Sequence, residues 1–134
     1  MLPALTIALC LCAASATLVI FALAIANSNP GSWETIVILG GWDVAVYVGI
    51  IVLAIAFRKS SRASAIMLLS AVVIGGFSVS ILYYCLSVYF TPPIPMNCVG
   101  PLVELGLPVL QWPALAVFAV FAFFSRGTRR SKPH

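Results

Sequence analysis

Four polar side chains could act together in this sequence, one in each of four long apolar stretches. They are Thr17, Asp43, Ser78 and Gln111. Asp43 is the only acid inside such a stretch, and an ionisable residue in an apolar segment of spanning length is a functional candidate. A carboxyl group, two hydroxyls and a carboxamide could share hydrogen bonds, or they could line a site for a proton, an ion or a small molecule.

The positions of these residues predict that they share one level. A helix rises 1.5 Å per residue, so Asp43 lies about 21 Å from the end of its stretch at Phe57. Ser78 and Gln111 lie at about the same height in their own stretches, and Thr17 lies slightly lower. We therefore predict a polar layer in the half of the bundle away from the basic residues.

Two interpretations of this layer remain open. In the structural one it is an interhelical hydrogen-bond network that sets helix register, and Asp43 is neutral because burial disfavours the charged form. In the functional one it lines a transport or binding site. Pro108 and Pro113 bracket Gln111 and free the carbonyls of Glu104 and Val109. A broken helix there would favour a site, and an ordinary proline kink would not.

The apolar stretches that hold these residues predict an integral membrane protein. The chain has 134 residues, 63% hydrophobic and only 7% charged, whereas a soluble domain carries about 25% charged residues. Four segments are long enough to cross a bilayer, which takes roughly 20 apolar residues as helix. We expect a single all-α domain over residues 1–134, a polytopic bundle of four antiparallel transmembrane helices at about 4–26, 34–57, 63–90 and 103–125, followed by a basic tail at 126–134.

Basic residues predict the orientation. They occur only in the second connection and in the tail, as Arg58, Lys59, Arg62, Arg126, Arg129, Arg130 and Lys132. The positive-inside rule places both regions in the cytoplasm, and an even number of spans then places the N-terminus there too. The two clusters are expected to act as topology signals that contact lipid headgroups. The alternative is docking of an acidic partner or nucleic acid, but neither cluster has the aromatic residues of a nucleic-acid surface.

Small residues on the second span predict a helix-packing face. Gly41, Ala45 and Gly49 follow one another at four-residue spacing, which lets another helix approach closely. The partner could be a helix of the same chain or one of another subunit.

The remaining reactive residues offer little chemistry. Cys85 and Cys98 both fall near the non-cytoplasmic face and could form a disulfide there in an oxidising compartment. Cys10 and Cys12 are expected to be inert small residues. The single histidine, His134, is at the chain's end, so no histidine-based catalytic or metal site is expected within the membrane. We expect no enzymatic activity, no cofactor and no bound metal.

These patterns favour a non-enzymatic membrane subunit that packs through the Gly41 face with copies of itself or with a larger membrane complex. The alternative is a small homo-oligomeric channel, a transporter or a membrane-disrupting effector that uses Asp43 and Gln111.

Overall fold

The computed structural model describes residues 1–26, 33–90 and 100–127 of the chain, with side chains for 1–23, 34, 37–38, 40–84 and 109–126. This described part is helical apart from the N-terminal residue and one short turn, and it contains no strand. Four helices make it up: α1 (Leu2–Ala26), α2 (Trp33–Ala56), α3 (Ser61–Phe90) and α4 (Gly100–Gly127). The four helices expected from the apolar stretches are present.

Three of these helices are long and apolar enough to cross a membrane. The qualifying segments are Leu2–Leu23 of α1, Ser61–Tyr84 of α3 and Val109–Arg126 of α4. The corresponding apolar segment of α2, Gly40–Ala56, is shorter, although α2 as a whole has 24 residues. Helix is the form expected of all four, because a run this apolar in a membrane must satisfy its backbone polar groups internally.

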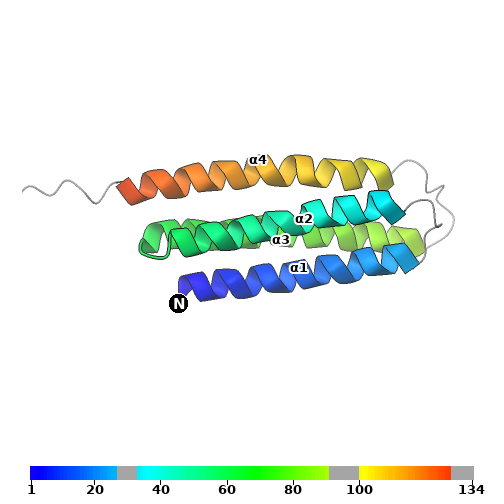
Figure 1. Ribbon diagram of the computed structural model, residues 1–134, viewed down its shortest axis with the longest axis horizontal. Helices are drawn as coiled ribbons and strands as arrows, with labels where there is room; N and C mark the ends of the chain where they lie inside the picture. Colours follow the sequence, from blue (N-terminus) through cyan, green and yellow to red (C-terminus); the bar gives the residue numbers. More distant parts are fainter. Residues whose placement is uncertain (27–32, 91–99, 128–134) are drawn as a thin grey trace, which may run out of the picture.

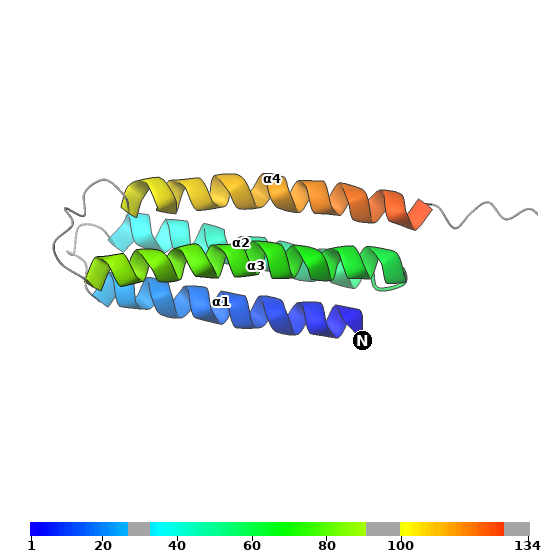
Figure 2. The same ribbon diagram turned by 180° about the vertical axis from the view of Figure 1, so that it is seen from behind.

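The four helices lie side by side along the long axis of the molecule (Figures 1 and 2). The sequence colours advance in one direction along α1 and α3 and in the other along α2 and α4 (Figure 1). α1 packs against α2 and α3, and α4 packs against α3 and α2. The consecutive helices α2 and α3 touch each other less than either touches α1. The helices are therefore arranged in a ring in the order α1, α2, α4, α3.

A tight turn joins α2 to α3. The backbone N–H of Ser60 donates to the carbonyl of Phe57 at 3.0 Å, and the Ser60 hydroxyl accepts from the N–H of Ala63 at 3.4 Å. Ser60 thus caps the start of α3, since a serine oxygen can satisfy one of the first N–H groups of a helix. Ser64 adds a bond from its hydroxyl to the Phe57 carbonyl at 3.2 Å.

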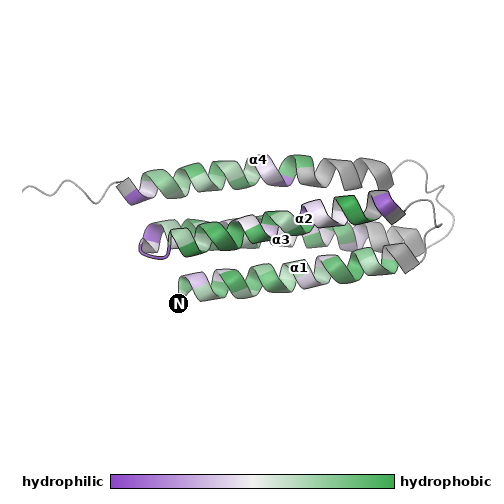
Figure 3. Ribbon diagram, viewed as in Figure 1, coloured by the Kyte–Doolittle hydropathy of each residue, from purple (hydrophilic) through white to green (hydrophobic). Residues whose placement is uncertain are grey.

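Apolar side chains fill the centre of the bundle and also cover its outside. The core includes Val46, Ile50, Met67 and Ala122, each with no exposed surface. Figure 3 shows hydrophobic colour along the helices and hydrophilic colour mainly at their ends. Large apolar side chains are exposed on all four helices; they include Leu11, Leu18, Ile38, Trp42, Val52, Leu69, Phe77, Val109, Phe121 and Phe124.

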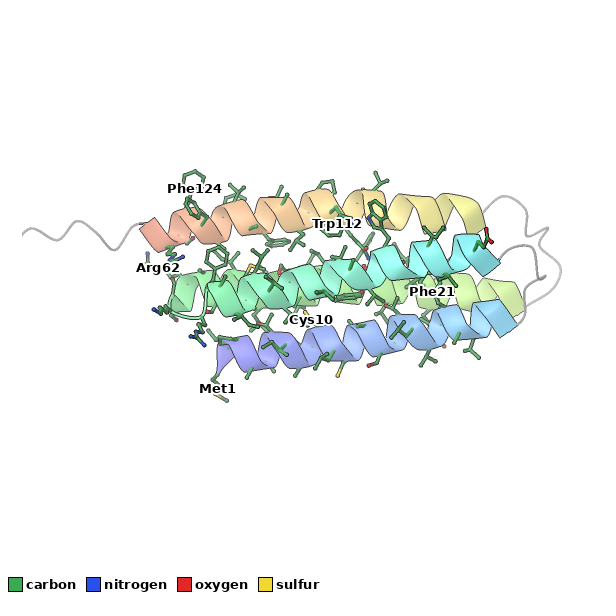
Figure 4. All side chains as sticks on the ribbon, in the orientation of Figure 1. Met1, Cys10, Phe21, Arg62, Trp112 and Phe124 are labelled. Carbon is green, nitrogen blue, oxygen red and sulfur yellow. The ribbon has the colours of Figure 1, made fainter. Side chains whose placement is uncertain are left out.

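Apart from Asp43, the described charged side chains lie at the two ends of the helices. Arg62 and the start of α1 at Met1 lie at the same end of the bundle (Figure 4). The ring of Phe124, near that end of α4, points outward from the bundle. Arg58, Lys59, Arg62 and Arg126 are all exposed. Glu34 is exposed in the first turn of α2, at the other end.

Candidate functional site

Each of the four helices contributes a buried polar residue to the interior. Thr17 of α1 and Ser78 of α3 have 0% exposure, Asp43 of α2 has 1% and Gln111 of α4 has 4%. All four residues of the predicted polar layer therefore face inward, although the outside of the same helices is apolar. Polar groups buried at this depth need partners, because an unpaired one costs several kcal/mol, roughly 2–7, away from water.

One direct hydrogen bond links two of these helices. The side-chain amide of Gln111 donates from Nε2 to the hydroxyl oxygen of Ser78, and the two atoms lie 2.6 Å apart in the buried interior. This bond joins α4 to α3 at one level. The two residues are 33 positions apart in sequence, so the bond depends on the packing of the helices and not on local structure.

Tyr47 belongs to the same group of side chains. It lies one helical turn after Asp43 on α2 and is 1% exposed. Its hydroxyl is close to the hydroxyls of Thr17 and Ser78 and within electrostatic reach of Asp43, but Oη forms no hydrogen bond of good geometry among the described residues. We use the name polar layer below for these five residues: Thr17, Asp43, Tyr47, Ser78 and Gln111.

Sequence reasoning did not place Tyr47 in the layer. The signal was present, because residues four apart share one face of a helix, and Tyr47 follows Asp43 by four. A tyrosine near a membrane interface is ordinary, whereas a tyrosine in the middle of an apolar helix, on the same face as the one acid that is buried among the described side chains, is not.

Other buried hydroxyls differ from the layer in how they are satisfied. Thr6 donates to the carbonyl of Leu2 at 2.9 Å, and Ser70 donates to that of Met67 at 2.7 Å. These bonds stay within one helix and join nothing across the bundle. Thr17 donates in the same way, to Ala13 at 2.8 Å, which leaves its oxygen lone pairs available to the layer.

Oxygen atoms dominate the chemistry of the layer, and most of them belong to groups that can both donate and accept hydrogen bonds. An ionised carboxylate only accepts, and a hydroxyl or amide oxygen accepts as well. Tyr47 Oη and Gln111 Oε1 are buried with no hydrogen-bond partner among the described residues. Within that part of the chain, no three His, Cys, Asp or Glu side chains come together in a way that could hold a metal ion. The layer therefore combines one acid with neutral oxygens.

The small-residue face on α2 is divided by the structure. Gly41 and Ala45 are exposed on the outside of the bundle, and a Cβ built on Gly41 would meet nothing within 4 Å. Gly49 is partly buried, and a Cβ there would lie 3.1 Å from Cδ2 of Leu115 on α4. Gly49 thus serves packing within the chain, whereas Gly41 and Ala45 do not.

Several predicted features have other outcomes. α4 continues as one helix from Gly100 to Gly127 through both Pro108 and Pro113, so the break considered around Gln111 is absent. Cys10 is buried and Cys12 is exposed, and both are free thiols. The predicted Cys85–Cys98 disulfide and the tail residues Arg129, Arg130 and Lys132 lie outside the residues and side chains that the structure describes.

We expect the Gln111–Ser78 hydrogen bond to appear as a coupling energy in a double-mutant cycle. The cycle uses Ser78→Ala, Gln111→Leu and the double variant. The loss of unfolding free energy in the double variant should be smaller than the sum of the two single losses by about 1 kcal/mol, because either single change already removes the bond. Reversible unfolding in mixed detergent micelles measures it. Ser70→Ala paired with Gln111→Leu is the matched control, since the Ser70 hydroxyl bonds within its own helix. If the losses of unfolding free energy in Ser78→Ala and Gln111→Leu simply add in the double variant, the hydrogen bond is contradicted.

Comparison of the chain with models of known protein families, with curated proteins and with solved structures found no match in any of the three.

Proposed function

We propose that this protein is a non-enzymatic integral membrane protein that acts as a structural or accessory subunit of a membrane complex. The distribution of its side chains carries the proposal. Large apolar side chains cover the outside of all four helices, while the described polar side chains between the helix ends are mostly buried. An apolar surface this extensive is typical of contact with a membrane or with other proteins, because soluble monomers expose contiguous apolar patches of only a few hundred Å².

The proposal includes a specific topology. α2 is the fourth span, the bundle is antiparallel, and both termini lie in the cytoplasm. The support is that Arg58, Lys59 and Arg62 are exposed at one end of the bundle with Arg126, while Glu34 is exposed at the other. The basic end would contact anionic headgroups of the cytoplasmic leaflet, at about 1 kcal/mol for each cation. The 24 residues of α2 span about 36 Å at 1.5 Å per residue, which exceeds the hydrocarbon thickness.

The face for assembly is the outward surface at Gly41 and Ala45. Helices associate in membranes mainly through close packing of small residues, since lipid tails are as apolar as leucine. Gly41 has open space around it and Ala45 is exposed, so another helix can approach the α2 backbone there without rearranging the bundle. The partner is a second copy of the chain or another membrane subunit, and no nucleic acid is involved.

The test replaces Gly41 with leucine. We expect Gly41→Leu to reduce self-association in the membrane at least about tenfold, because the side chain would hold the partner helix away. Split-reporter halves fused to the C-terminus measure association, and they also require that this end lies in the cytoplasm. Gly76→Leu is the matched control, because Gly76 is likewise exposed on a helix with nothing within 4 Å of an added Cβ.

Two results would count against this assignment. Equal loss of association in Gly41→Leu and Gly76→Leu would show that the α2 face is not the specific contact. A chain that stays monomeric in native membranes and co-purifies with no membrane protein would contradict the subunit function itself.

The buried polar layer favours a second candidate function. An acid and several oxygens inside a bundle are features of small channels, transporters or membrane-disrupting effectors. Ion flux in liposomes that disappears in Asp43→Asn would support this candidate over the subunit.

A further inference from the structure

The polar layer contains two buried oxygens, one on Tyr47 and one on Gln111, that no donor among the described residues serves. The Thr17 hydroxyl hydrogen is used within α1, on Ala13. One Nε2 hydrogen of Gln111 is used on Ser78. Gln111 Oε1 and Tyr47 Oη are buried and have no partner in the described part of the chain. Burial of such oxygens is costly unless something supplies positive charge or hydrogen-bond donors to them.

The charge of the layer limits which species could satisfy these buried oxygens. Asp43 is the only formally charged side chain among the five residues, since every Lys and Arg of the sequence lies at 58–62 or 126–132. One monovalent cation would leave an ionised layer neutral. A divalent cation would leave a net positive charge inside an apolar bundle, where an uncompensated charge costs several kcal/mol, of order 5 or more.

We propose that the polar layer binds one small monovalent cation and that this cation is Na⁺. The Asp43 carboxylate supplies the charge, and Gln111 Oε1 and Tyr47 Oη supply oxygens that the fold itself leaves without partners. The Thr17 and Ser78 hydroxyls are buried as well, and with them the candidate oxygen ligands come from all four helices. Oxygens of this kind suit hard, weakly polarising cations. This inference goes beyond the subunit function and needs no partner protein.

Binding by all four helices has a measurable consequence for stability. A cation that binds the folded bundle and not the unfolded chain stabilises the fold in proportion to the logarithm of its concentration. The full chain, purified in detergent, should melt at a temperature on the order of 10 °C higher with Na⁺ a hundredfold above its dissociation constant than in choline chloride of equal ionic strength. Equilibrium dialysis with ²²Na⁺ should give one bound ion per chain.

Two variants locate the site. Asp43→Asn should weaken Na⁺ binding by more than about 100-fold, because it removes the only charged ligand. Glu34→Gln is the matched control, because it removes an exposed carboxylate at the end of α2 and should leave Na⁺ binding unchanged. Gln111→Leu should weaken binding as well, while leaving the carboxylate in place.

The wild-type dialysis result does not depend on whether any variant folds. No saturable ²²Na⁺ binding by the folded wild-type chain would overturn the proposal and would leave ordered water or a proton as the occupant of the layer. Equal stabilisation by choline chloride and sodium chloride would overturn it as an effect of ionic strength. Unchanged binding in a folded Asp43→Asn variant would overturn the assigned position. A chain that is monomeric in native membranes, co-purifies with no membrane protein and still binds Na⁺ would refute the subunit proposal and support this one.

Discussion

Replacing Tyr47 with alanine is expected to lower the free energy of unfolding by about 3 kcal/mol, the lower end of the range for removing a buried aromatic ring. Tyr47 is among the largest fully buried side chains, and its ring packs beside Gly75, where an added Cβ would lie 3.7 Å from Cε1. The lower end applies to the proposed membrane location, where lipid is as apolar as the core and the loss comes mainly from the cavity and the missing contacts. Unfolding in mixed micelles measures it.

The control for Tyr47→Ala is Tyr47→Phe in sodium-free buffer. Phenylalanine keeps the ring and removes a hydroxyl that has no hydrogen-bond partner in the described structure, so we expect a change within about 0.5 kcal/mol. A cost for Tyr47→Phe as large as that for Tyr47→Ala would show that the hydroxyl, and not the ring, holds the bundle together. Val48→Ala, at an exposed neighbouring position, should have little effect.

Gly40→Leu is expected to destabilise the bundle by about 1–3 kcal/mol through overpacking. A Cβ at Gly40 would lie 3.1 Å from Cγ and 3.2 Å from Cδ1 of Phe21 on α1, before the rest of the leucine is added. The α1–α2 contact would have to open. The measurement is unfolding at a dilution at which the chain is monomeric in detergent.

The adjacent glycine is the control for Gly40→Leu. Gly41→Leu makes the same chemical change one position later, where nothing lies within 4 Å, and it should leave monomer stability almost unchanged. Gly40→Leu combined with Phe21→Ala should recover part of the loss by clearing the ring. If the two leucine variants are equally stable, α1 and α2 do not pack as described.

Apolar length was sufficient to predict the four helices. α1 ends at Ala26, as expected from the cluster of turn residues that follows it, and α3 ends at Phe90. The other observed ends differ from the predicted ones by three residues or fewer. Helix ends could be predicted this closely because polar turn residues interrupt runs that otherwise have no reason to stop.

The neighbours of each helix could not be predicted in the same way. The short connection from Arg58 to Arg62 favours close packing of α2 against α3, yet each of these helices makes more contact with α1. A turn fixes only the ends of two helices. The packing faces are hard to read because these helices are apolar all round, so the sequence lacks the stripe that marks the buried face of a helix in a soluble protein.

The polar residues supplied part of the missing information about faces. Thr17, Asp43, Ser78 and Gln111 could be selected because each is costly to expose to lipid, and all four are buried. The small residues were less informative. Gly41 and Gly49 have the same spacing signal, but one is outside the bundle and the other packs on Leu115, and only the rotation of α2 decides between them.

The ring order of the helices has a consequence for biosynthesis. α1 and α2 are made as one pair and α3 and α4 as the next, and the two pairs meet along α1 and α3 and along α2 and α4. Thr17, Asp43 and Tyr47 are made with the first pair, whereas Ser78 and Gln111 arrive with the second. In a membrane, a ribosome that has completed only the first pair would leave an acid and two hydroxyls facing lipid. The nascent chain would therefore depend on an insertase or chaperone to shield them until translation of α4 is complete.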